Sequence, residues 1–143
     1  MTLACSQLGM ITHRRHPMGD FKRLVAWQKA HAFELAVHAA FKGRRLAAAP
    51  GFRGQLLRAV GSIPDNLAEG CGKRSRRALA KYAEDAYASA KEVENDLIKA
   101  RDLGLLPRTQ CEDLLRQGDE VSRLCFSLSR VPPDQPSPDE ALS

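Results

Sequence analysis

Aromatic residues make up only 6% of this 143-residue chain, and no apolar run approaches the roughly 20 residues that a membrane span requires. Sheets draw on aromatic and β-branched residues, whereas alanine, which is frequent here, favours helices. The composition therefore predicts an all-α protein that does not span a membrane. Positive charge is in excess, since the formal net charge is +5, and this makes an acidic partner plausible, nucleic acid first and an anionic membrane surface second. Of these two we expect nucleic acid and no membrane.

The cysteines are few and scattered. Cys5, Cys71, Cys111 and Cys125 show no C-x-x-C spacing, and no cluster of histidines accompanies them. Neither a zinc site nor a disulfide scaffold is indicated, so we expect no metal and no cofactor. This use of cysteine fits a reducing cytoplasm. The first twenty residues lack the continuous apolar region of a signal peptide, and we expect a flexible arm over residues 1–20.

One domain over residues 21–130 carries four segments with helical spacing of apolar residues. The predicted helices run from Lys22 to about Leu46, from Gly51 to Gly70-Cys71-Gly72, from an N-cap at Ser75 to Gly104, and from Pro107 to Arg130. The predicted inward residues are Trp27, Ala30, Phe33, Val37 and Phe41; Leu56, Val60, Ile63, Leu67 and Cys71; Leu79, Tyr82, Ala86, Ala90, Val93, Leu97 and Ala100; and Cys111, Leu114, Gly118, Val121, Cys125 and Leu128. Residues 131–143 are proline-rich and acidic and are predicted to be disordered.

Short connections between these helices favour an antiparallel up-down four-helix bundle. Pro64 lies inside the second apolar pattern, where it lacks an N–H and should kink or restart the helix at a cost of about 3 kcal/mol. Two compensations are open: Ser62 could cap a restarted helix with Pro64 just inside it, or the Ser62 and Asn66 side chains could bond the backbone groups that the proline leaves without a partner. Tyr87 and Ile98 lie off the main stripe of the third helix, which indicates either self-association or a broad face within one bundle.

The segment from Gln55 to Gly70 carries the pattern Q-x-x-R-A-x-x-S-I-P-x-N-x-A-E-G. We take six of its residues as the structural signature of the chain: Arg58, Ser62, Pro64, Asn66, Glu69 and Gly70. Trp27-Gln28-Lys29-Ala30 precedes this pattern. Gly70-Cys71-Gly72-Lys73-Arg74-Ser75 continues it, and here Gly72, Arg74 and Ser75 are matched to a G-x-G-R-x-S link. Over about residues 20–105 the chain resembles the four-helix bundle proteins encoded in intervening sequences of 23S ribosomal RNA genes.

This resemblance implies a left-handed bundle, generally a homopentamer with a central channel, and no established enzymatic activity. A related branch contains the accessory proteins of diversity-generating retroelements, which are basic pentamers that bind a reverse transcriptase and nucleic acid. Asp65 departs from the family pattern, where a small residue is usual, and Ala88 replaces a common glycine.

A cluster of cations without an acid lies where a loop enters the third predicted helix: Lys73, Arg74, Arg76, Arg77 and Lys81. Helix N-termini and basic side chains together favour phosphate binding. The cations that would extend this nucleic-acid site, if the helix ends meet, are Arg44, Arg45, Arg53 and Arg58. A merely solvated surface is the alternative, although several copies in a ring would bind multivalently and with strong salt dependence. The lack of an exposed aromatic series argues against stacking on single-stranded bases.

Catalytic arrangements are poorly represented. Arg58 and Glu69 lie about 16 Å apart along an ideal helix, so Glu69 is expected to be a buried acceptor for another helix or subunit. His31, Glu34 and His38 share a helix, but the third helix supplies no histidine for a di-iron site. No nucleophile lies in a recognisable elbow. We therefore expect a non-enzymatic oligomer that binds RNA or a ribonucleoprotein, with a protein-interaction scaffold as the alternative and a small-molecule enzyme third.

Overall fold

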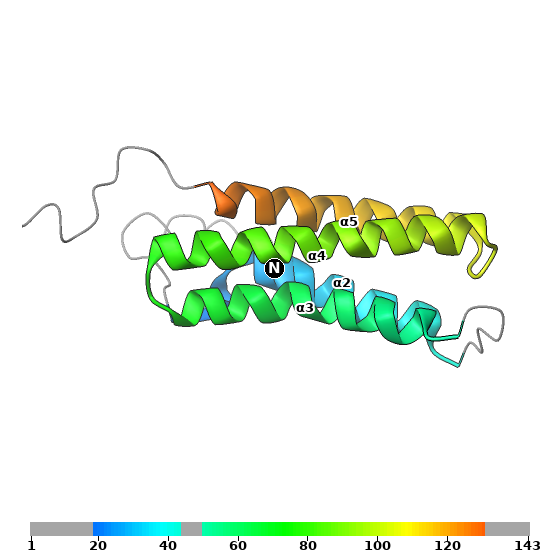
Figure 1. The fold of residues 1–143 in the computed structure, drawn as a ribbon, viewed down its shortest axis with the longest axis horizontal. Coiled ribbons are helices and arrows are strands. Elements are labelled where there is room, and N and C mark those ends of the chain that lie inside the picture. Colours follow the sequence, from blue (N-terminus) through cyan, green and yellow to red (C-terminus); the bar gives the residue numbers. More distant parts are fainter. Residues whose placement is uncertain (1–18, 44–49, 131–143) are drawn as a thin grey trace, which may run out of the picture.

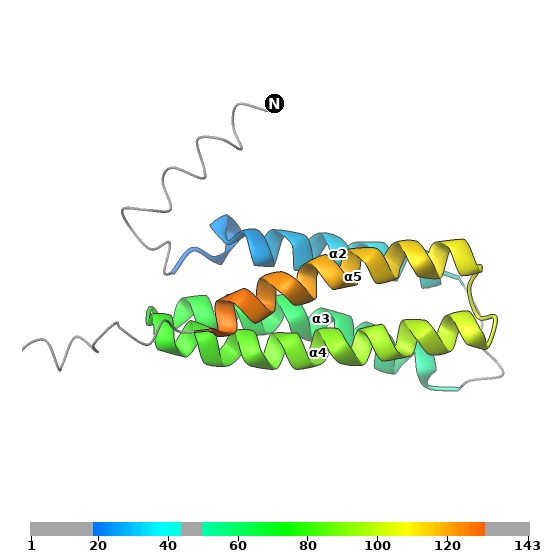
Figure 2. The ribbon, with the colours of Figure 1, turned by 90° about the horizontal axis from the view of Figure 1, so that it is seen from above.

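Four α-helices occupy most of the part of the chain that the computed structural model describes, residues 19–43 and 50–130 (Figure 1). A short 3-10 turn, η1 (Phe21–Arg23), precedes α2 (Val25–Phe41), α3 (Phe52–Gly72), α4 (Arg76–Asp102) and α5 (Arg108–Ser129), and these residues include no strand. Each helix packs against the next, and α5 packs against α2 (Figure 2). The prediction of an all-α protein with four helices is confirmed.

The first helix is shorter than its sequence pattern predicts. The side chain of Asp20 accepts a hydrogen bond from the Lys22 N–H at 3.3 Å and thereby caps η1, and the extended Leu24 separates this turn from α2. The helix ends at Phe41, where the chain becomes extended and then reaches Gly43 with φ 71°, a left-handed conformation that glycine adopts without strain. The predicted helix from Lys22 to about Leu46 was therefore wrong at both bounds: within the described residues, α2 begins at Val25 and ends at Phe41.

The other predicted boundaries agree with the structure to within one or two residues. Gly51, with φ 82°, precedes α3, and α3 ends at Gly72. The hydroxyl of Ser75 accepts the Ala78 N–H at 3.2 Å, which confirms Ser75 as the N-cap of α4. Pro107 stands immediately before α5, where its missing N–H has no helical partner to lose.

Pro64 lies inside α3, which continues through it, so the helix does not restart at Ser62. Instead the Ser62 hydroxyl donates to the carbonyl of Ala59 at 2.7 Å, and the Asn66 amide donates to the carbonyl of Ser62 at 2.8 Å. The carbonyl that loses its helical donor is that of Val60, four residues before the proline. The two side chains thus bond the carbonyls of Ala59 and Ser62. Neither reaches the carbonyl of Val60, so the second predicted compensation, in which they bond the group that the proline strands, was wrong.

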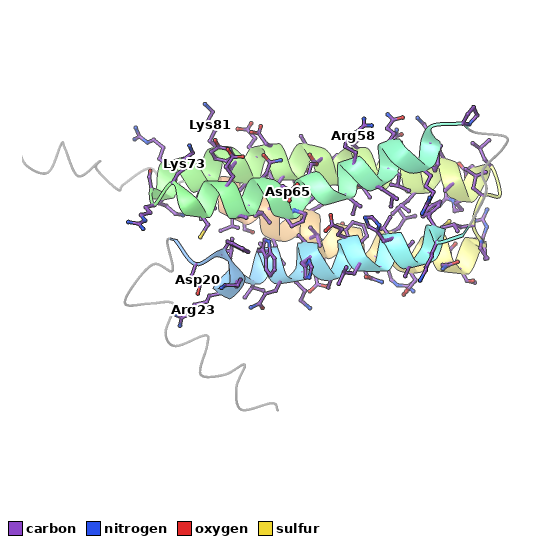
Figure 3. The ribbon with its side chains drawn as sticks, turned by 90° about the horizontal axis from the view of Figure 1, so that it is seen from below. Asp20, Arg23, Arg58, Asp65, Lys73 and Lys81 are labelled. Atoms are coloured by element: carbon purple, nitrogen blue, oxygen red, sulfur yellow. The ribbon has the colours of Figure 1, made fainter. Side chains whose placement is uncertain are left out.

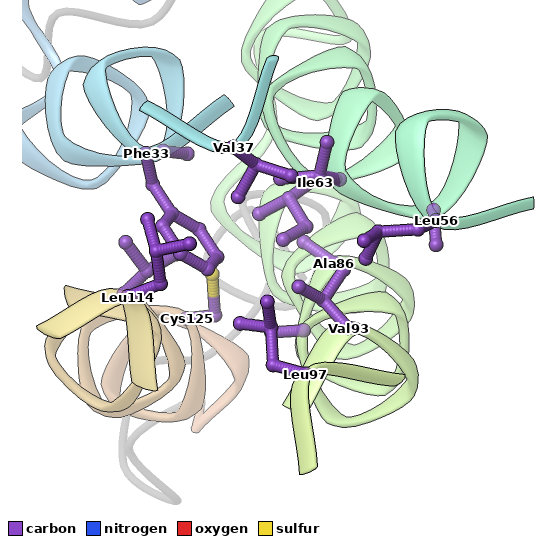
Figure 4. Packing of buried hydrophobic residues seen from close by; sticks show 14 of the residues in the cluster. Phe33, Val37, Leu56, Ile63, Ala86, Val93, Leu97, Leu114 and Cys125 are labelled. Atoms are coloured by element: carbon purple, nitrogen blue, oxygen red, sulfur yellow. The ribbon is translucent and has the colours of Figure 1, made fainter. Parts of the chain in front are cut away.

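The core runs along the axis between the four helices (Figure 4). Of the predicted inward residues, all are buried except Trp27, Tyr82 and Leu128, which are partly exposed. Burying one large aliphatic side chain contributes about 1.5–3 kcal/mol, so this set accounts for the assembly of the four helices. None of the described helices combines the length and apolar character of a membrane span.

Three predictions fall on residues outside the described part of the chain. They concern residues 1–18 of the predicted arm, the predicted disordered tail over residues 131–143, and the cations Arg44 and Arg45.

Candidate nucleic-acid interface

Three residues connect α3 to α4 and reverse the direction of the chain. Lys73, the first residue after α3, still has helical backbone angles. Arg74 takes a left-handed conformation with φ 58°, and Ser75 is extended with φ −129° and ψ 133°. A left-handed conformation is uncommon for a residue with a side chain, and here it turns the backbone within a single residue. The result is an exposed corner that presents Lys73 and Arg74 to solvent at one end of the bundle (Figure 3).

Arg76 differs from its basic neighbours because its guanidinium is bonded within the bundle. Its two terminal nitrogens donate to the carbonyls of Leu128 at 2.8 Å and Arg130 at 3.2 Å. These carbonyls belong to the end of α5, where helical acceptors lack N–H partners and the helix dipole favours a positive charge. The structure therefore gives Arg76 the role of holding α5 to the start of α4.

The end of the molecule that contains the α3–α4 connection gathers exposed cations from three further elements. We call this surface the basic end and define it by seven residues: Lys22, Arg23, Lys73, Arg74, Arg77, Lys81 and Arg130. A Cβ on residue 19 would lie 3.8 Å from Nε of Arg74, and η1 packs against α3, so the start of the described chain adjoins this corner (Figure 3). Sequence reasoning missed Lys22, Arg23 and Arg130 because only the fold brings them beside residues 73–81.

Two of the predicted cations lie elsewhere. Arg53 stands in the first turn of α3, twenty residues before Lys73 in one continuous helix, which places the two about 30 Å apart. Arg58 lies part of the way along the same helix, away from the basic end (Figure 3). The predicted extension of the basic cluster by Arg53 is therefore wrong in space, because the start and the end of one helix lie at opposite ends of the bundle.

Ion pairing distinguishes the basic end from the rest of the surface. Lys22 approaches Asp20 at 4.0 Å, but Lys73, Arg74, Arg77 and Lys81 have no ion pair with any described residue. Elsewhere six cations are paired: Lys29–Glu120, Lys91–Glu94, Arg101–Asp102, Arg108–Glu112, Arg116–Asp113 and Arg123–Asp119. Among the described residues, the exposed cations without an ion pair outside the basic end are Lys42, Arg53, Arg58 and Lys99, and they are spread over three helices and their ends. At the basic end, by contrast, four unpaired cations lie within nine consecutive residues, where they can attract phosphates without first breaking a salt bridge.

A second feature is an open groove of about 510 Å³ between α3 and α4. Its lining residues are Gly51, Gln55, Arg58, Ala59, Ser62 and Glu92, most of which belong to the distinctive sequence pattern. One turn beyond Glu92, the carboxyl of Asp96 is 4% exposed, and its Oδ2 has no hydrogen-bond partner among the described residues. Burial raises the pKa of Asp96; the charge of Lys99 opposes this effect and that of Glu92 adds to it.

Glu69 is exposed, so the prediction of a buried acceptor was wrong. Its Oε1 still accepts a hydrogen bond, from the Tyr82 hydroxyl of α4 at 3.4 Å, and thus links two helices as the pattern suggested. Glu69 projects outward because Gly70, one residue further, occupies the position that faces α4.

Groups that could support other chemistry are sparse. Within residues 19–43 and 50–130 there is no cluster of three or more histidine, cysteine or acidic side chains arranged to hold a metal ion. Cys71, Cys111 and Cys125 are buried. Burial raises the pKa of Cys125 to about 12, so this thiol stays protonated at neutral pH and is a poor nucleophile.

Comparison with known proteins identifies the family. No curated protein matches the sequence significantly. The model of one protein family, the 23S rRNA-intervening sequence proteins, matches residues 22–127, which extend from η1 into the last turns of α5. This match includes α2, α3, α4 and nearly all of α5, which is most of the chain, and it agrees with the pattern from Gln55 to Gly70. The chain therefore belongs to the 23S rRNA-intervening sequence protein family.

Proposed function

We propose that this protein is a non-enzymatic, oligomeric four-helix bundle protein that binds RNA, or a ribonucleoprotein, through its basic end. The observation that carries the proposal is the group of exposed cations without ion pairs: Lys73, Arg74, Arg77 and Lys81. The start of α4 adds backbone N–H groups and the positive end of a helix dipole at the same corner. Contacts of this kind bind phosphates without reading sequence.

Arg76 is not among the proposed contacts, although it lies within the basic run. Its guanidinium already serves the carbonyls of α5, and releasing it would sacrifice both hydrogen bonds. Lys22, Arg23 and Arg130 take its place, since the fold brings them to the same end.

The assembly that we propose is a homopentamer of antiparallel up-down bundles, each with α3 kinked at Pro64, in the cytoplasm. Support comes from family membership and from the interior proline. In a ring, several basic ends would engage one RNA at once, and linked weak contacts raise the overall affinity. Light scattering tests the assembly: the predicted mass is five times the 15.8 kDa of the chain, and a monomer would refute it.

A charge-reversal pair tests the binding surface. Replacing Lys73 and Arg77 with glutamate should weaken binding to a structured RNA at least tenfold at low salt, because each reversal removes an attraction and adds a repulsion. The matched control reverses Lys42 and Arg53, which are exposed and lie away from the basic end. Equal losses from both pairs would mean that net charge alone governs binding, and no loss from the first pair would refute the proposed surface.

The groove between α3 and α4 favours a second candidate, a protein-interaction scaffold. Asp96 does not line the groove but lies one turn beyond its residue Glu92. A buried carboxyl without a partner is costly, and a cationic side chain that entered from another protein or subunit would relieve that cost. Replacing Arg58 with glutamate at the groove tests this reading. A fall in assembly mass with unchanged RNA affinity would assign the groove to contacts between copies, whereas an unchanged mass would speak against that role.

A further inference from the structure

An aromatic pair bridges α4 and α5 on the outer surface of the bundle. The ring centroids of Tyr87 and Phe126 lie 5.6 Å apart at an interplanar angle of 53°, within the range of favourable aromatic contacts. Tyr87 is half-buried, but Phe126 is 49% exposed. The contact explains why Tyr87 lies off the main stripe of its helix: it faces α5 within the same bundle. It does not explain why a phenylalanine remains half in water.

Cations flank both rings. The Lys91 ammonium lies 5.4 Å from the Tyr87 centroid, and the guanidinium of Arg130 lies 5.8 Å from the Phe126 centroid. Lys91 is paired with Glu94 at 2.8 Å, so its charge is largely compensated. Arg130 has no ion pair with a described residue, and its side chain is free to turn toward a phosphate.

The aromatic pair is continuous with the basic end. Arg130 belongs to both, since its guanidinium reaches Phe126 while its carbonyl is held by Arg76 at the start of α4. Toward the middle of the bundle the surface changes character, because Arg123 is paired with Asp119 at 3.0 Å. Of the cations near the rings, the one without an ion pair to a described residue, Arg130, therefore lies on the side of the basic end. This direction suits a ligand whose bases lie on Phe126 and whose phosphates lie toward Arg130 and beyond.

We propose that Phe126, supported by Tyr87 and flanked by Arg130, is a stacking platform for an unpaired base of single-stranded nucleic acid whose phosphates follow the basic end. The proposal rests on the proposed RNA binding and specifies its ligand class. It departs from the expectation drawn from sequence, in which the lack of an exposed aromatic series argues against stacking on single-stranded bases. One exposed ring beside a row of cations suffices for a base, since every base has an aromatic face.

The test compares three ligands of equal length at fixed salt: an unstructured 12-nucleotide RNA, an abasic phosphodiester of the same length, and an RNA duplex. Phe126→Ala should weaken binding of the single strand by roughly fivefold to a hundredfold and leave the abasic and duplex ligands unaffected. Phe126→Leu should lose as much, because it keeps apolar area without a ring, whereas Phe126→Trp should retain binding. The control is Leu103→Ala, which removes another exposed apolar side chain and should change nothing.

The outcomes separate this proposal from the one on which it rests. Equal affinity of the wild-type protein for the single strand and the abasic ligand would overturn the stacking platform and leave phosphate binding intact. Failure to bind any of the three ligands would overturn both. Light scattering on Phe126→Ala covers the remaining case: a fall in assembly mass would assign the ring to an interface between copies and overturn the platform.

Discussion

Gly70 of α3 lies directly against Tyr82 of α4: a Cβ on residue 70 would stand 2.6 Å from the Cβ of Tyr82. The same Cβ would stand 3.3 Å from the backbone of Leu79, so neither neighbour could move aside through a flexible side chain. The last glycine of the Gln55–Gly70 pattern therefore permits the close approach of α3 and α4. This approach also sets the short connection that exposes Lys73 and Arg74.

Replacing Gly70 with alanine should lower the free energy of unfolding by about 1–3 kcal/mol, because α3 and α4 must separate to admit the methyl group. Gly72 is the matched control, since a Cβ there would meet no atom within 4 Å. Gly72→Ala should be neutral or stabilising by up to about 1 kcal/mol. Urea unfolding of both variants checks the pair, and equal stabilities would contradict the close approach.

Arg76 and Arg77 are neighbours in sequence with different expected roles. Arg76→Met should destabilise the protein by about 1–2 kcal/mol, since the carbonyls of Leu128 and Arg130 lose a charged donor. Arg77→Met should leave stability within about 0.5 kcal/mol and weaken RNA binding instead. Thermal unfolding and RNA titration on both variants provide the readouts. A reversed assignment, with Arg77 stabilising the fold, would contradict the described geometry.

The carboxyl of Asp96 predicts a pH dependence. Because burial raises its pKa above the ordinary value of 3.8, the folded state binds this proton more tightly than the unfolded chain does. The contribution of Asp96 to the free energy of unfolding is therefore largest below about pH 3.8 and falls as the pH rises through the pKa of the folded state. Above the folded pKa this contribution stays low. Asp96→Asn should stabilise the protein at pH 7 by on the order of 1 kcal/mol, with a gain that shrinks toward pH 4. Destabilisation at pH 7 would instead reveal a cationic partner for Asp96 in the assembly.

Pro64 provides a test of the interrupted helix. Pro64→Ala restores an N–H to the carbonyl of Val60, a gain of about 3 kcal/mol, and removes about two buried methylenes, a loss of about 1.6 kcal/mol. The subunit should therefore become more stable by roughly 1 kcal/mol. Light scattering on the same variant asks whether the proline shapes the assembly. A clear loss of stability would show that the proline is needed within the single bundle.

Much of this fold could be predicted from sequence because local signals act over one or two turns. Ser75, Gly51 and the glycines at the end of α3 mark their boundaries by capping and turn chemistry. The start of α2 was predicted too early, at Lys22. Asp20 caps a separate 3-10 turn just before α2, and in the sequence this turn cannot be told from the first turn of the helix. The roles of Arg76 and Phe126 depend on contacts that spacing along one helix does not encode, because Arg76 bonds carbonyls 52 and 54 positions away and Phe126 packs on Tyr87 of another helix.

The salt dependence of RNA binding tests the central claim most directly. Phosphate contacts release counterions, so the logarithm of the binding constant should fall linearly with the logarithm of salt concentration, by about 0.7–0.9 per phosphate contacted. We predict a slope of about −3 or steeper for the wild-type protein, and a clearly smaller slope after reversal of Lys73 and Arg77. A flat response between low and physiological salt, or an unchanged slope in the double variant, would contradict RNA binding through the basic end.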